Sequence, residues 1–142
     1  MKAALPLRIA SILTFIHAVL HTIGGVFGKV PPGPAAVAAL AMQTNQFVAL
    51  GVTRTFWQYY RGMGLAVTIF LTAEAIVFWQ LSNLAKANAP RLRPIFATFF
   101  LAYLVFAIDS YLYFFSAPVI TEVLIALCFA WALFAAKPAA TA

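Results

Sequence analysis

Long apolar runs, separated by short polar or proline-rich breaks, dominate this chain. Four of them cover residues 7–28, 55–84, 94–115 and 117–136. A helix rises about 1.5 Å per residue, so each run is long enough to cross a hydrocarbon core of about 30 Å. The pattern therefore predicts four transmembrane helices.

The breaks between the runs predict one further element. KVPPGP, at Lys29 to Pro34, cannot continue a helix. Residues 35–51 then place Val37, Leu40 and Phe47 on one helical face and carry no charge. We expect a short helix over 35–51 at the membrane surface or over the mouth of the bundle, with a simple linker as the alternative. The predicted fold is an all-α integral membrane protein with a four-helix bundle and this interfacial helix, in one membrane domain over 1–142.

Composition supports the same class. The chain is 65% hydrophobic and only 8% charged, whereas soluble domains are about a quarter charged. The net charge of +6 does not predict a nucleic-acid partner, because the basic residues stand at the ends of apolar runs. With a single cysteine, Cys128, the chain cannot form an internal disulfide.

The basic residues also predict the orientation. If the N-terminus is cytoplasmic, six of them lie inside and three outside, which follows the positive-inside rule. The inside set is Lys2, Arg8, Lys86, Arg91, Arg93 and Lys137, and the outside set is Lys29, Arg54 and Arg61. We therefore expect a multi-pass protein of a bacterial inner membrane with both termini in the cytoplasm. The N-terminal apolar run continues through two histidines, so we expect a retained helix rather than a cleaved signal peptide.

Few charged or ionisable side chains interrupt the apolar runs, and they are the candidate chemistry. They are His17, His21, Arg61, Glu74, Asp109 and Glu122. A charged side chain within a membrane helix costs roughly 2.5–3.5 kcal/mol on insertion scales, so it usually has a partner and a function. Counting along the helices places His21, Arg61, Asp109 and Glu122 in the outer half, with His17 just below them. Glu74 falls in the inner half.

Two interpretations of these residues stay open. In the structural one, Arg61 pairs with Asp109 or Glu122, and the histidines donate interhelical hydrogen bonds. In the functional one, they form a polar pocket whose catalytic residues are His17, His21, Asp109 and Glu122, with proton transfer to or from an amphiphile. The ligand-binding residues would then be Arg61, Tyr60, Tyr111, Tyr113 and Glu74, although the tyrosines are also typical interface anchors.

The spacing of His17 and His21 also allows a metal ion on one helical face, completed by Asp109 or Glu122. However, HAVLH lacks the glutamate of the HExxH zinc-protease pattern. We therefore predict no metal site, and the sequence identifies no cofactor.

Two segments carry a family resemblance: HAVLHTIGG at 17–25 and RTFWQYYRGMGLAVTIFLTAEAIVFWQL at 54–81. They resemble a family of small bacterial four-helix membrane proteins with a histidine-containing first helix. In size and layout the chain is also similar to DoxX-type proteins and to the sterol-isomerase/sigma-2 receptor group. The resemblance implies four spans and no particular activity.

These observations favour a small membrane protein that binds or modifies a lipid-like or hydrophobic small molecule in an outer-half pocket. An accessory subunit of a larger membrane complex and a small proton- or ion-coupled transporter are the alternatives. Membrane lipids are the expected partners, and a homo-oligomer or a membrane-complex partner stays open, as does enzymatic activity. No nucleic acid is expected.

Overall fold

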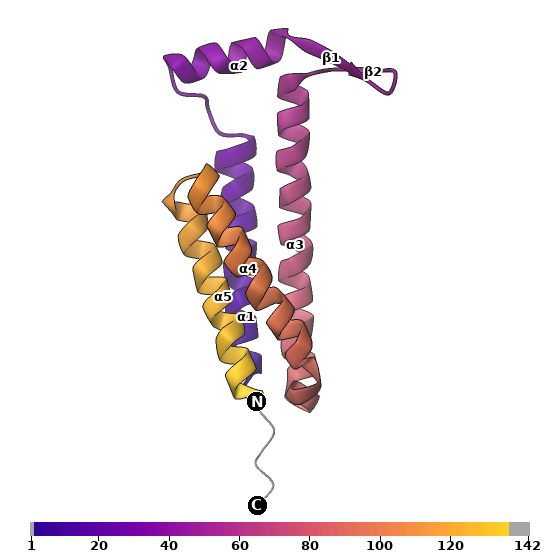
Figure 1. Ribbon diagram of the computed structural model, residues 1–142, viewed down its shortest axis with the longest axis vertical. Helices are drawn as coiled ribbons and strands as arrows, with labels where there is room; N and C mark the ends of the chain where they lie inside the picture. Colours follow the sequence, from indigo (N-terminus) through magenta and orange to yellow (C-terminus); the bar gives the residue numbers. More distant parts are fainter. Residues whose placement is uncertain (1, 137–142) are drawn as a thin grey trace, which may run out of the picture. The chain divides into compact units, whose positions relative to one another are not determined.

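The computed structural model describes residues 2–136, most of them helical (Figure 1). Lys137, one of the residues that predict the orientation, lies outside this range. The elements are α1 (Ala4–Leu20), the π-helix η1 (His21–Val26), α2 (Pro34–Thr44), β1 (Gln46–Ala49), β2 (Val52–Thr55), α3 (Phe56–Asn88), the 3₁₀-helix η2 (Ala89–Leu92), α4 (Arg93–Tyr113) and α5 (Ser116–Ala135).

Three helical stretches among the described residues are long and apolar enough to cross a membrane. They are Ala4–Val26, Phe56–Tyr113 and Ser116–Ala135. The second contains α3 and α4 with the short η2 turn between them. The apolar runs therefore predicted the helical stretches well, the largest difference being at the end of α3, which continues to Asn88 rather than to residue 84. Four separate spans stay a prediction.

Contacts divide the chain into two compact units, which we describe separately. The first comprises the residues up to His17 and those from Leu71 onward, and the second is Ala18–Phe70. Helices α1 and α3 contribute residues to both units. The single membrane domain predicted from the sequence stays a prediction.

The core of the first unit is one cluster of buried residues from α1, α3, α4 and α5. At its centre the rings of Phe78 and Phe129 meet edge to face, with centroids 4.7 Å apart, and Phe99 lies 4.8 Å from Phe78. Edge-to-face pairs of this kind add about 0.5–1.5 kcal/mol to the burial of the rings. The antiparallel helices α4 and α5, joined by Phe114 and Phe115, pack along each other in Figure 1.

Helix α1 buries mostly small residues, together with Leu7, and exposes most of its large ones. Its buried face includes Ala10, Ser11, Thr14 and Ala18, at helical spacing. Small side chains let two helices approach closely. The approach allows the Ser11 hydroxyl to donate a 2.6 Å hydrogen bond to the backbone carbonyl of Ala75 on α3.

The second unit contains the end of α1, where the helix widens. The amide of Phe27 donates to the Thr22 carbonyl at 3.0 Å, five residues back, and this bond closes the π-helix η1. The proline-rich break follows, and Gly33, with φ of 93°, provides the N-cap of α2. Pro34 takes the first helical position, where its missing N–H costs nothing.

A β-hairpin corrects the predicted all-α fold. Helix α2 ends at Thr44, and β1 pairs with β2 in antiparallel register from Gln46↔Thr55 to Ala49↔Val52. The two turn residues, Leu50 and Gly51, have φ of 50° and 78°, as the two-residue turn of a twisted hairpin requires. The predicted helix over 35–51 is therefore wrong beyond Thr44. The apolar positions in this stretch fit the period of a helix as well as that of a strand. The β-branched residues of VTRT, at 52–55, and the glycine at the turn favour strands.

A capping box fixes the hairpin to the start of α3. The backbone N–H of Gln58 donates to the Thr55 hydroxyl at 3.1 Å, and the backbone N–H of Thr55 donates to the Gln58 side-chain oxygen at 2.9 Å. Phe47 of β1 packs against Phe56 and Tyr59, with ring centroids 5.1 and 5.7 Å away. The hairpin and the first turn of α3 therefore form one local structure.

Within the second unit, Gly64 of α3 contacts η1 so closely that it has no room for a side chain. A Cβ atom at Gly64 would lie 2.9 Å from a methyl carbon of Val26, whereas one at Gly62 would meet nothing within 4 Å. We expect Gly64→Ala to lower the free energy of unfolding by about 1–3 kcal/mol through overpacking. Thermal unfolding in detergent, followed by circular dichroism, measures the change.

Gly62→Ala is the matched control, because it makes the same chemical change on the same helix without a clash. Alanine has the higher helix propensity, so this variant should be as stable as the wild type or more stable by up to about 1 kcal/mol. Equal unfolding temperatures for the two variants would contradict the close contact.

Candidate functional site

A buried carboxyl group lies between α4 and α5 in the first unit. Glu122 is 1% exposed, and its Oε1 atom accepts a 2.9 Å hydrogen bond from the hydroxyl of Ser110, which is 2% exposed. Its other oxygen, Oε2, is also buried and has no hydrogen-bond partner among residues 2–136. A buried oxygen without a partner costs about 1–3 kcal/mol, so this atom is the first candidate for a ligand contact.

Helical periodicity explains why these two side chains meet. On α4, Tyr103, Ala107 and Ser110 share the buried face, and on α5 Glu122 shares it with Phe129. These spacings of three, four and seven residues lie along one side of a helix. Packing of the two faces therefore brings the Ser110 hydroxyl to the carboxyl group.

A second carboxyl group in this unit has a hydroxyl partner from the same face of α4. The Tyr103 hydroxyl donates to Oε2 of Glu74 at 2.8 Å. The Thr14 hydroxyl oxygen lies 3.5 Å from the Tyr103 hydroxyl oxygen. Thr14 donates to the Ala10 carbonyl at 2.9 Å. Tyr103 and Ser110 are seven residues apart, which is about two helical turns, so one face of α4 serves both glutamates.

The third acidic residue, Asp109, is exposed on α4 and interacts electrostatically with Glu122. All three acidic side chains of the chain thus belong to the first unit. Of the two outer-half acids, Glu122 is buried and Asp109 is exposed.

His21 holds two elements of the second unit together. Its Nε2 atom lies 3.0 Å from the backbone oxygen of Gly64 on α3. A carbonyl oxygen only accepts hydrogen bonds, so Nε2 carries the proton. This contact matches the interhelical hydrogen bond of the structural interpretation. Beside it, the Thr22 and Thr68 hydroxyls lie 2.9 Å apart.

Arg61 and Tyr60 have aromatic partners in the second unit. The Arg61 guanidinium carbon lies 4.7 Å from the centroid of the Phe27 ring, a cation–π contact. Tyr60 stacks on Trp57 with centroids 5.7 Å apart. In the first unit, Tyr111 and Tyr113 are 77% and 75% exposed at the end of α4. The positions of these tyrosines suit interface anchors better than a buried site.

His17 is half-buried on α1 in the first unit. The predicted pocket combines it and the two outer-half acids with His21 and Arg61, which belong to the second unit. Their convergence spans the two units and stays a prediction. Among the described residues, no group of three His, Cys, Asp or Glu side chains is close enough to hold a metal ion.

Sequence analysis missed the hydroxyl partners Tyr103, Ser110 and Thr14. Their signal was weak, because hydroxyl side chains are common in apolar helices. The useful clue was spacing: Tyr103 and Ser110 are seven residues apart on a helix that otherwise carries few polar groups.

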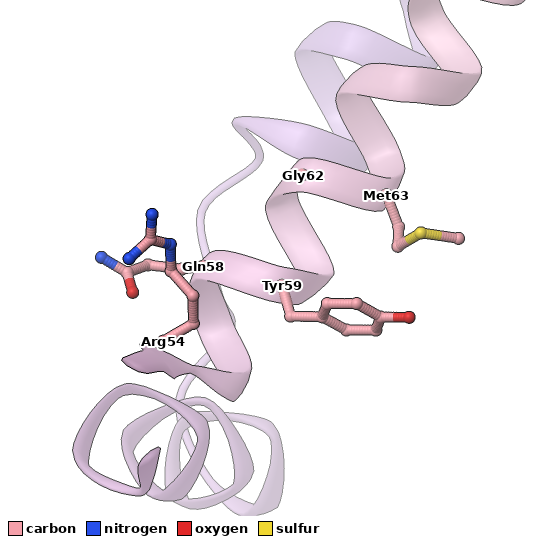
Figure 2. A pocket seen from close by; sticks show the side chains of 5 residues that line it. All are labelled: Arg54, Gln58, Tyr59, Gly62 and Met63. Atoms are coloured by element: carbon pink, nitrogen blue, oxygen red, sulfur yellow. The ribbon is translucent and has the colours of Figure 1, made fainter. Parts of the chain in front are cut away.

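A shallow pocket lies on the surface of the second unit, where β2 meets α3. Its volume is about 380 Å³, and its lining residues are Arg54, Gln58, Tyr59, Gly62 and Met63 (Figure 2). It combines two polar side chains with an apolar floor. The sequence analysis did not single out this site.

Comparisons with protein-family models, with curated proteins and with solved structures found no match.

The Ser110–Glu122 hydrogen bond predicts a stability effect. Ser110→Ala leaves both oxygens of the buried carboxyl group without a partner, so we expect the free energy of unfolding to fall by about 1–3 kcal/mol. Thermal or denaturant unfolding in detergent measures the loss. Thr98→Ala, which removes an exposed hydroxyl bonded within the same helix, should change stability by less than about 0.5 kcal/mol. Equal losses in both variants would contradict a special role for Ser110.

Proposed function

We propose that this chain is an integral membrane protein with four spans that binds a lipid-like or hydrophobic small molecule at the buried Glu122 carboxyl group. The observation that carries the proposal is the unpartnered Oε2 atom of a side chain that is 1% exposed. The ligand would present a hydrogen-bond donor, such as a hydroxyl or an amine, to this oxygen.

The distribution of side chains supports membrane insertion. On α1, the large residues Leu5, Ile12 and Phe15 are 55%, 52% and 54% exposed, while the buried residues are small or hydroxyl-bearing except for Leu7 and Pro6. A water-soluble helix has the opposite arrangement, with its large apolar residues buried. In a bilayer the outward apolar face contacts lipid tails, and small inward residues allow close helix packing.

The apolar surroundings of Glu122 support a ligand with a hydrophobic body. Its helix presents Ile125, Ala126 and Phe129 on the same buried face, and α4 presents Ala107. Small-molecule sites are typically lined by many apolar groups and a few polar ones, and the residues around this carboxyl group have that composition. A lipid-like molecule could reach the site through the helix surfaces without crossing water.

The proposed location is a bacterial inner membrane with both termini in the cytoplasm. It is supported by the excess of basic residues on one side of the predicted spans.

The proposal predicts that Glu122→Gln loses the bound molecule. Glutamine keeps an oxygen to accept from Ser110 and replaces Oε2 with an amide donor, so a donor on the ligand would face a donor on the protein. We expect ligand occupancy to fall about fivefold or more, because a typical hydrogen bond contributes about 1 kcal/mol. Mass spectrometry of organic extracts from the detergent-purified protein measures it.

Asp109→Asn is the matched control, because it makes the same chemical change at an exposed neighbouring carboxyl group. Its extract should match that of the wild type, and all three proteins should have the same helical content. Identical extracts from wild type and Glu122→Gln would overturn the proposed site.

Proton-coupled transport is the second candidate, favoured by the Thr14–Tyr103–Glu74 hydrogen-bonded group. Hydroxyl and carboxyl groups in contact can pass protons, and intramembrane acids commonly serve in such relays. Under this alternative, the wild type would speed the decay of a pH gradient in proteoliposomes, and Tyr103→Phe would abolish the effect. A dye enclosed in the vesicles reports it, and a wild-type rate equal to that of empty vesicles would exclude proton movement.

A further inference from the structure

The surface pocket at the start of α3 combines two polar side chains with two larger, partly apolar ones. Arg54, from β2, provides a guanidinium group, and Gln58, from the first turn of α3, provides a side-chain amide. Both side chains extend to the same side in Figure 2, whereas Tyr59 and Met63 extend to the other. Gly62 adds no side chain between them.

The hydrogen bonds already made in this region leave mainly donors available. The capping box uses the Gln58 side-chain oxygen, which accepts from the Thr55 amide at 2.9 Å, so the Gln58 NH₂ group remains to donate. Arg54 donates from one terminal nitrogen to the Thr53 carbonyl at 2.8 Å, and its other N–H groups remain. A phosphate oxygen is the acceptor that a guanidinium group binds best.

The net positive charge of the second unit also favours an anionic ligand. Residues 18–70 contain three basic residues, Lys29, Arg54 and Arg61, and no aspartate or glutamate. Arg61 is engaged with the Phe27 ring. No acidic side chain of this unit therefore competes with an external anion for Arg54.

The rest of the pocket favours a lipid over a soluble anion. Tyr59 and Met63 are 58% and 55% exposed, and they continue the pocket along α3. Trp57 and Tyr60, which stack on each other in the first turns of α3, are residue types that concentrate at the membrane–water interface. A phosphate at Arg54 would thus be followed by apolar surface suited to an acyl chain.

We propose that this pocket binds an anionic phospholipid, with the phosphate on Arg54 and Gln58 and an acyl chain along Gly62, Tyr59 and Met63. The inference rests on the membrane insertion proposed above, but it does not depend on the ligand at Glu122. The bound lipid would hold the hairpin and the start of α3 at the membrane surface.

Native mass spectrometry of the full chain in detergent, titrated separately with phosphatidylglycerol and phosphatidylcholine, tests the proposal. The wild type should bind phosphatidylglycerol more tightly. Arg54→Gln should weaken phosphatidylglycerol binding about fivefold, the usual contribution of one basic residue near an anionic lipid surface. Its phosphatidylcholine binding should remain unchanged.

The matched control is Arg91→Gln, which removes one positive charge at an exposed position in η2, outside the second unit. It should retain wild-type binding of phosphatidylglycerol. Gly62→Leu tests the apolar part of the pocket, and it should weaken both lipids because the new side chain occupies the floor. Helical content measured by circular dichroism confirms that each variant is folded.

Three outcomes would overturn the proposal: no preference for phosphatidylglycerol in the wild type, equal losses in Arg54→Gln and Arg91→Gln, or displacement of the lipid by an equal concentration of inorganic phosphate. Glu122→Gln should leave phosphatidylglycerol binding unchanged. The lipid titration and the extract analysis of the Glu122 site can therefore fail independently.

Discussion

A carboxyl group in an apolar helical core needs at least one neighbouring group that donates a hydrogen bond to it. In the first unit this constraint acts twice, at Glu122 on α5 and at Glu74 on α3, and both times the donor comes from α4. Ser110 and Tyr103 lie two turns apart on one face, so a single rotation of α4 gives each acid one hydroxyl donor. A different rotation would turn these hydroxyls away and leave both carboxyl groups without donors. The polar contacts therefore specify how α4 packs against its two neighbours, while Phe78 and Phe129 lie within the buried core around them.

Small side chains allow hydrogen bonds between elements by letting their backbones approach closely. Alanine, serine and threonine on α1 allow close approach, and Ser11 uses it to reach a backbone carbonyl on α3. In the second unit, Gly64 allows Val26 to approach. The carbonyl oxygen of Gly64 also accepts a hydrogen bond from Nε2 of His21. Close packing and hydrogen bonding are coupled in both places, because a donor reaches a backbone oxygen only where no larger side chain separates the helices.

The hairpin region differs from the helical core in its exposure and in its residue types. Leu50 at its turn is fully exposed in a left-handed conformation that leucine rarely adopts. Phe47, Phe56 and Tyr59 join the hairpin to α3, and the capping box satisfies the first amides of the helix. Aromatic rings, basic groups and uncharged polar side chains occur together here, as they do where a protein meets lipid headgroups. This composition supports the proposal that a lipid headgroup binds in the shallow pocket at Arg54.

The sequence by itself determined the helical stretches, because apolar runs of this length interrupted by prolines allow few alternatives. Scarcity of charge also marked Glu74, Asp109 and Glu122 as unusual. It did not determine the hairpin, because positions such as Phe47 and Val48 suit either a helix or a strand until their packing partners are known. It did not identify the partners of the two glutamates either. Tyr103 is 29 residues from Glu74 and Ser110 is 12 residues from Glu122. Only the rotation of packed helices decides which hydroxyl faces which acid, and that rotation depends on the complementarity of whole surfaces rather than on any local pattern.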